Sequence, residues 1–225
     1  MRHILGPKRF IFEKAKGLLA PAPRFVICGT GRCGTGSAAQ MLANAGVVCG
    51  HEAAFTPWGY CKRWGLTGDV SWLAQPHLKH FRGIVVHLVR APQDTVQSML
   101  DTGKFDPGRD DVYVRFLRRR MPLSGNPVDD AYAWYVYSNR GIEPYATVRF
   151  KITELVEMTD WIAQRLGMTP RKIDAVRTNP KTNQKKKYFG SHCDGSIASI
   201  ASPALRREVG DMAARYGLPL SGNSM

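Results

Sequence analysis

The stretch from Arg24 to Glu52 constrains the fold more than any other part of the sequence. It begins with a short apolar run, Phe25–Cys28, which is typical of a buried strand. A glycine-rich loop over 29–37 follows. Four apolar residues then lie at the i, i+3, i+4, i+7 spacing of a core-facing helix: Ala38, Met41, Leu42 and Ala45. A second apolar run begins at Val47. Strand, loop, helix and strand predict a βαβ unit, and hence an α/β fold with a mostly parallel sheet flanked by helices.

The glycine loop is suited to binding an anion. Glycine lets the main chain turn tightly and approach a phosphate closely. The N–H groups at the start of the following helix lack backbone partners, and the helix dipole adds positive potential there. A Walker A loop is excluded, because Gly36 is followed by Ser37 and Ala38 instead of lysine and a hydroxyl residue.

Two interpretations of the loop follow from its residues. In the first, Gly29, Gly31 and Gly34 form a G-x-G-x-x-G pattern, and Glu52 lies roughly where a Rossmann fold places its ribose-binding acid. This would make the protein an NAD(P)-binding enzyme. In the second, a basic side chain and hydroxyl groups within the loop bind an oxyanion.

The second interpretation matches a known motif. The run G-T-G-R-C-G-T-G-S resembles the 5′-phosphosulfate loop of the sulfotransferases, which use 3′-phosphoadenosine 5′-phosphosulfate (PAPS) as sulfate donor. Cys33 stands where that family more often has serine. The resemblance implies a P-loop-like sheet and assigns donor binding to seven loop residues: Gly31, Arg32, Cys33, Gly34, Thr35, Gly36 and Ser37. Beside Arg32 and a helix N-terminus, the thiol of Cys33 is expected to have a lowered pKa.

A second motif favours the sulfotransferase interpretation. The apolar run 83–89 predicts a strand that is buried on both faces. It ends in Arg90, and after a proline turn Ser98 follows eight residues later, a spacing that resembles the family's 3′-phosphate motif. Ala91 occupies a position that is commonly aspartate. A Rossmann enzyme has no use for this second arginine–serine pair.

The resemblance also implies a mechanism, which is in-line transfer of a sulfuryl group from PAPS to an acceptor hydroxyl of a carbohydrate, glycolipid or small molecule. Glu52 is the expected general base, with His51 as the second candidate, and Arg32 would stabilise charge on the bridging oxygen. If the strand continues through residues 51 and 52, their side chains point to opposite faces, and only one of them can face the donor. No metal is required, and no Cys/His cluster has zinc spacing.

The charge of the chain predicts anionic partners. Its 32 Lys and Arg residues outnumber 18 acidic ones, giving a formal charge of +14. A nucleotide, an acidic saccharide, an anionic membrane surface and nucleic acid are all compatible with this charge. A nucleic-acid-binding module is less favoured, because aromatic residues interleave with the basic ones at one pair only. The resemblance implies a basic segment over the nucleotide, with candidate contacts from Lys181, Lys185, Lys186 and Lys187.

The predicted domain covers residues 24–217, between a basic segment with a proline-rich linker (1–23) and a short tail (218–225). For the basic segment we expect packing on its own domain in preference to a membrane surface. The aromatic-rich stretch 53–82 and the arginine-rich stretch 104–127 are expected as acceptor-side insertions. No apolar run reaches transmembrane length, and five cysteines without a disulfide framework favour a reducing compartment. The expectation is a soluble, cytoplasmic protein of bacterial or phage type.

Overall fold

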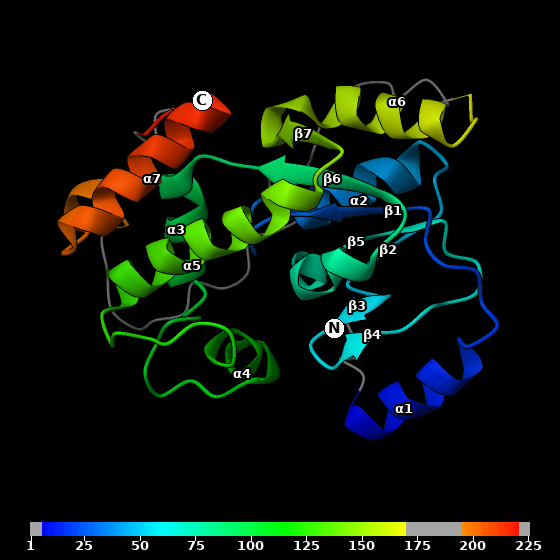
Figure 1. The fold of residues 1–225 in the computed structure, drawn as a ribbon, viewed down its shortest axis with the longest axis horizontal. Helices are drawn as coiled ribbons and strands as arrows, with labels where there is room; N and C mark the ends of the chain where they lie inside the picture. Colours follow the sequence, from blue (N-terminus) through cyan, green and yellow to red (C-terminus); the bar gives the residue numbers. More distant parts are fainter. Residues whose placement is uncertain (1–5, 170–194, 221–225) are drawn as a thin grey trace.

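A computed structural model describes residues 6–169 and 195–220 of the chain. Its centre is a five-stranded sheet in which every pairing is parallel and the strand order is β2-β5-β1-β6-β7 (Figure 1). The strands are β1 (Phe25–Cys28), β2 (Cys49–His51), β5 (Gly68–Val70), β6 (Ile84–Val89) and β7 (Val148–Lys151). The predicted fold class, a mostly parallel sheet flanked by helices, is confirmed.

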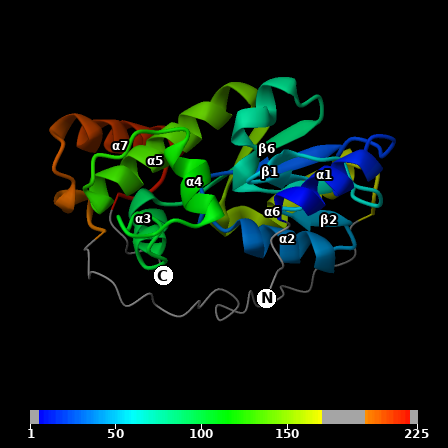
Figure 2. The same ribbon diagram turned by 90° about the horizontal axis from the view of Figure 1, so that it is seen from below.

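Helices cover both faces of this sheet (Figure 2). The helices α2 (Thr35–Asn44) and α6 (Leu155–Arg165) pack on one face. The other face carries α3 (Pro92–Leu100), α5 (Pro127–Ile142), α7 (Pro203–Tyr216) and the 3₁₀ segment η1 (Trp72–His80). Side chains of β1 alternate between the two faces. Phe25 and Ile27 pack in the core beneath α2 and α6, and Val26 and Cys28 pack in the core on the opposite face. Burial on both sides explains why β1 and β6 are continuous apolar runs.

The stretch 53–82 is more than an insertion, and that expectation is wrong in its second half. Gly68–Val70 forms β5, which lies between β2 and β1 in the main sheet. Gly68 leaves room for the ring of Phe25, because a Cβ atom there would lie 2.3 Å from ring atoms. The remainder of the stretch forms η1 and a small antiparallel hairpin of β3 (Phe55–Thr56) and β4 (Gly59–Tyr60).

Short elements complete the described chain. The N-terminal helix α1 (Pro7–Lys16) packs through Phe10 beside the β3–β4 hairpin, and α4 (Val112–Arg118) lies within the arginine-rich stretch 104–127. The 3₁₀ turns are η2 (Glu143–Tyr145), η3 (Ile152–Glu154) and η5 (Ile197–Ser199).

Within residues 6–169 and 195–220, no helix combines the length and hydropathy needed to cross a membrane. The candidate contacts Lys181, Lys185, Lys186 and Lys187 lie outside the described residues.

Candidate functional site

The glycine loop joins β1 to α2 at the carboxyl ends of the parallel strands, where open α/β sheets bind their ligands. Gly34, the N-cap of α2, has a φ of 106°, and a Cβ atom there would lie 2.0 Å from Ile152 Cδ1. Only glycine fits this position. Since glycine has no side chain with which to cap the helix, the first N–H groups of α2 remain available to an anion.

The two sequence motifs meet at this loop. Arg32, with a left-handed φ of 77°, donates a hydrogen bond from Nε to Ser98 Oγ at 2.9 Å. Arg90 donates from Nη1 to the carbonyl oxygen of Arg32 at 3.4 Å, and its Nε lies 3.7 Å from Asp94 Oδ2. Arg90, which follows β6, and Ser98 of α3 therefore contact the β1–α2 loop directly, so the predicted 5′ and 3′ motifs form one cluster.

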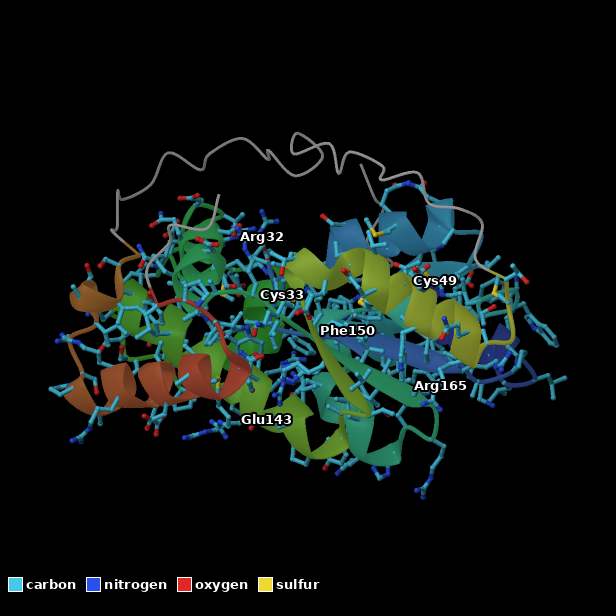
Figure 3. All side chains as sticks on the ribbon, turned by 90° about the horizontal axis from the view of Figure 1, so that it is seen from above. Arg32, Cys33, Cys49, Glu143, Phe150 and Arg165 are labelled. Carbon is cyan, nitrogen blue, oxygen red and sulfur yellow. The ribbon has the colours of Figure 1, made fainter. Side chains whose placement is uncertain are left out.

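The cluster concentrates positive charge. The pKa of Arg32 is lowered mainly by burial and, to a smaller extent, by the nearby positive charge of Arg90. Two guanidinium groups so close together repel each other, and a bound anion would offset that repulsion. The hydroxyl of Thr30, in the same loop, is buried without a hydrogen-bond partner among the described residues. Figure 3 shows Arg32 beside α3 at the edge of the fold.

A third cation, Lys104, lies at the loop and was not predicted. Its Nζ lies 4.4 Å from the centre of the Trp72 ring, and a Cβ atom on Gly31 would lie 3.2 Å from that Nζ. Gly31 thus lets the ammonium group and the indole approach the loop backbone closely. Lys104 follows α3 in a turn at Gly103, where φ is 62°. Nothing in the spacing of the sequence connects this turn with the glycine loop.

Cys33 differs from its expected state. Its side chain is 1% exposed and packs in the core beneath α2 and α6, and Figure 3 shows it further inside than Arg32. Burial raises the pKa of the thiol to about 12, although the positive charge of Arg90 opposes the rise. The prediction of a lowered pKa is therefore wrong. The thiol also fills space beside Gly29, where a Cβ atom would lie 2.6 Å from Sγ.

His51 and Glu52 converge instead of pointing apart. β2 ends at His51, and Glu52 has a φ of 56°, so the alternation of an extended strand stops between them. His51 Nε2 lies 4.0 Å from Glu52 Oε1 and 3.3 Å from Thr35 Oγ1. The expectation of opposite faces required the strand to continue through residue 52, and the structure does not meet that condition. His51 instead connects the glycine loop with the Glu52 carboxylate.

Both oxygens of the Glu52 carboxylate accept hydrogen bonds from residues that the sequence did not indicate. Trp72 Nε1 donates to Oε1 at 3.1 Å, and Tyr113 Oη donates to Oε2 at 2.9 Å. Trp72 comes from η1 and Tyr113 from α4, so the stretches 53–82 and 104–127 both reach the site. The side chain of Glu52 remains 20% exposed.

A buried carboxylate fixes the turn that follows Glu52. Asp69, in β5, is fully buried; its Oδ1 accepts from Ala53 N at 3.1 Å, and its Oδ2 accepts from Ala54 N and Phe55 N at 3.0 Å. Burial raises the pKa of Asp69 to about 6, and the three N–H donors oppose the rise. Its role could not be found from the sequence, because β5 itself was not predicted.

Two arginines of the 104–127 stretch, Arg109 and Arg115, are hydrogen-bonded to neighbouring carboxylates. Arg109 Nε donates to Asp111 Oδ2 at 2.7 Å, and Arg115 Nη1 donates to Asp110 Oδ2 at 3.0 Å. In the described part of the chain, no group of three or more His, Cys, Asp or Glu residues could hold a metal ion.

The strand order does not meet the requirements of the dinucleotide-binding interpretation. The Rossmann order 3-2-1-4-5-6 places the strand that follows the first helix beside the first strand. Here β5 separates β2 from β1, so Glu52 follows an edge strand directly. Its carboxylate is held by Trp72 and Tyr113.

No family model and no curated protein matches the sequence. Two solved structures are similar over most of the chain. A sulfotransferase from Alicyclobacillus acidocaldarius shares 14% identity at a TM-score of 0.48, with 89% of this chain and 98% of that chain covered. The mouse sulfotransferase SULT7A1, in a structure complexed with PAP, shares 12% identity at a TM-score of 0.43, with 91% of this chain and 90% of that chain covered.

Proposed function

We propose that this protein is a PAPS-dependent sulfotransferase that transfers a sulfuryl group to a hydroxyl of a carbohydrate, glycolipid or small molecule. The observation that carries the proposal is the direct contact between the two motifs. Arg32 of the glycine loop hydrogen-bonds Ser98, and Arg90 hydrogen-bonds the backbone of Arg32. A nucleotide with phosphates at both its 5′ and 3′ positions needs two such basic groups in one site.

The donor roles follow from the type of group at each position. The N–H groups and hydroxyls of Gly34, Thr35, Gly36 and Ser37 would bind the 5′-phosphosulfate at the uncapped start of α2. Gly31 would let the chain approach the same group, with Arg32 and Lys104 supplying positive charge. Arg90 and Ser98 would bind the 3′-phosphate. Cys33 would contribute through the loop backbone alone, because its thiol lies in the core.

The reaction would form one bond and break another at sulfur. The acceptor oxygen attacks the sulfur atom, the bond from sulfur to the bridging oxygen breaks, and 3′,5′-bisphosphoadenosine (PAP) leaves with the electron pair. Arg32 would stabilise the negative charge that develops on the bridging oxygen. Glu52 would accept the proton of the acceptor hydroxyl, with its carboxylate oriented by Trp72 and Tyr113. His51 lies between this base and the loop.

The donor site can be tested by ligand binding. PAP should raise the melting temperature of the protein, and NADH should not. Arg90→Ala should weaken PAP binding by about 2–4 kcal/mol, because a charged contact to the 3′-phosphate is lost. Ser98→Ala should weaken it less, through the loss of one hydroxyl. Adenosine 5′-phosphosulfate, which lacks the 3′-phosphate, should lose much less affinity in both variants.

Arg207→Ala, an exposed arginine on α7, serves as the matched control and should bind both ligands as the wild type does. Equal loss of both ligands in Arg90→Ala would make Arg90 a structural residue. Stabilisation by NADH, with none by PAP, would overturn the proposed function altogether.

A further inference from the structure

The helix α1 presents large apolar side chains to solvent. Its inner side is anchored by Phe10, which is 9% exposed, and by Gly17, where a Cβ atom would lie 2.1 Å from the Lys62 carbonyl oxygen. Glu13 Oε2 lies 3.9 Å from Arg63 Nη1 at the same contact. These contacts fix which face of the helix turns outward. Figure 1 shows α1 at the periphery of the fold.

Four exposed apolar side chains belong to α1 and to the turn that follows it, and we call them the α1 patch: Ile11 (68% exposed), Phe12 (57%), Leu18 (69%) and Leu19 (86%). Nine large hydrophobic side chains are exposed in the described chain, and four of them lie in this nine-residue stretch. Single exposed apolar residues are ordinary, but a cluster of this kind marks an interaction surface. Packing against its own domain, as expected for this segment, therefore buries only one side of α1 and leaves the apolar residues of the other side in solvent.

Basic residues accompany the α1 patch in the same segment. Four exposed cations belong to the same helix: Lys8, Arg9, Lys14 and Lys16. Lys16 Nζ lies 4.4 Å from the centre of the Phe12 ring, so charge and apolar surface are directly adjacent. The single acidic residue of α1, Glu13, faces Arg63 at the inner contact.

We propose that α1 docks the protein onto an anionic membrane surface, with the α1 patch inserted at the boundary between headgroups and acyl chains. A helix with apolar residues flanked by lysine and arginine is suited to that boundary, where anionic headgroups supply the complementary charge. A second copy of this chain is a poorer partner. A two-fold interface would place the same four cations opposite each other.

The proposal is independent of the reaction at the donor site, and sedimentation of the full chain with lipid vesicles tests it. The protein should bind vesicles of phosphatidylcholine mixed with phosphatidylglycerol, and bind pure phosphatidylcholine much more weakly. Lys8→Gln with Lys16→Gln should lower partitioning onto the anionic vesicles roughly 25-fold, at about fivefold per charge. Leu18→Ser with Leu19→Ser should lower it by about tenfold or more, because the inserted apolar area is lost.

Matched controls separate this surface from general effects of charge and hydrophobicity. Val48→Ser with Val156→Ser removes exposed apolar side chains elsewhere, and Arg119→Gln with Arg207→Gln removes exposed cations elsewhere. Both control pairs should bind as the wild type does. Failure of the wild type to bind anionic vesicles overturns the proposal, and so does unchanged binding by the α1 variants. A dimer in analytical ultracentrifugation that the Leu18 and Leu19 changes dissociate would also overturn it, in favour of a second copy. Circular dichroism melting verifies that each variant is folded.

Discussion

At the scale of single residues, chain neighbours indicate chemistry but not burial. Arg32 and Ser98 were identified from their motifs, and they hydrogen-bond each other. Cys33, next to Arg32, was expected to be reactive for the same reason, yet its side chain lies in the core. Nothing in the neighbouring sequence marks Tyr113 or Lys104 as a site residue. Only the folded chain brings Tyr113 to Glu52 and Lys104 to the glycine loop.

Tyr113 is expected to position the Glu52 carboxylate. Tyr113→Phe removes the hydrogen bond to Oε2 and keeps the ring, so turnover should fall roughly 10- to 100-fold through misalignment. Affinity for PAP should be unchanged. Glu52→Gln, which removes the proton acceptor itself, should cost about 10²–10⁴-fold in turnover.

Steady-state sulfation with a good acceptor, together with PAP titration, measures both effects. Tyr145→Phe, at an exposed tyrosine in η2, is the control and should leave both quantities unchanged. If Tyr113→Phe weakens PAP binding and leaves turnover intact, Tyr113 belongs to the donor site instead.

The thiol of Cys33 should resist alkylation in the folded protein. With a pKa of about 12, its thiolate fraction at neutral pH is roughly a thousandfold or more below that of an ordinary cysteine, and burial blocks access as well. Mass spectrometry after iodoacetamide treatment should find Cys33 modified in denaturant and unmodified in native buffer, with or without PAP. If Cys33 is instead labelled rapidly in native buffer and PAP suppresses the labelling, the thiol lies on the ligand face of the loop.

At the scale of elements, continuous apolar runs were predictable and short polar strands were not. β1 and β6 are buried on both faces, so their residues alone reveal them. β5 has the sequence Gly-Asp-Val, without an apolar run. Its glycine accommodates Phe25, and its aspartate binds the backbone after Glu52. Those roles depend on neighbours that are distant in the sequence.

Asp69→Asn should therefore destabilise both the fold and the site. The asparagine amide group turns at least one N–H donor toward the N–H groups of Ala53, Ala54 and Phe55, where the carboxylate now accepts. The free energy of unfolding should fall by about 1–3 kcal/mol, and turnover should fall as the Glu52 turn loosens. Urea denaturation measures the first effect. Asp211→Asn, on the exposed side of α7, is the control; equal stability of the two variants would contradict a structural role for Asp69.

At the scale of the whole molecule, the layered sheet was predictable from the βαβ pattern, and its strand order was not. The order β2-β5-β1-β6-β7 depends on where the chain crosses, and the missed β5 concealed it. The layers also bury polar groups that the sequence presents as ordinary strand residues. His87 of β6 is fully buried between the sheet and α7. Its Nε2 pairs with Asn139 Oδ1 at 2.8 Å, and its ring lies edge-on to Tyr216.

Burial of His87 should make the fold sensitive to acid. Desolvation lowers its pKa from 6.5 to about 4, so the unfolded chain binds a proton before the folded chain does. The contribution of neutral His87 to the free energy of unfolding is therefore fully present above about pH 6.5. It is lost as the pH falls toward 4, by at most about 3 kcal/mol. His87→Gln, which cannot take up the proton, should show a flatter decline of unfolding free energy between pH 7 and pH 4.5 in urea titrations.

Asp69, whose raised pKa gives the opposite slope, is present in both proteins and cancels in the comparison. His80→Gln, at an exposed histidine, is the control, and an equal decline in wild type and His87→Gln would show that His87 does not set the acid limit.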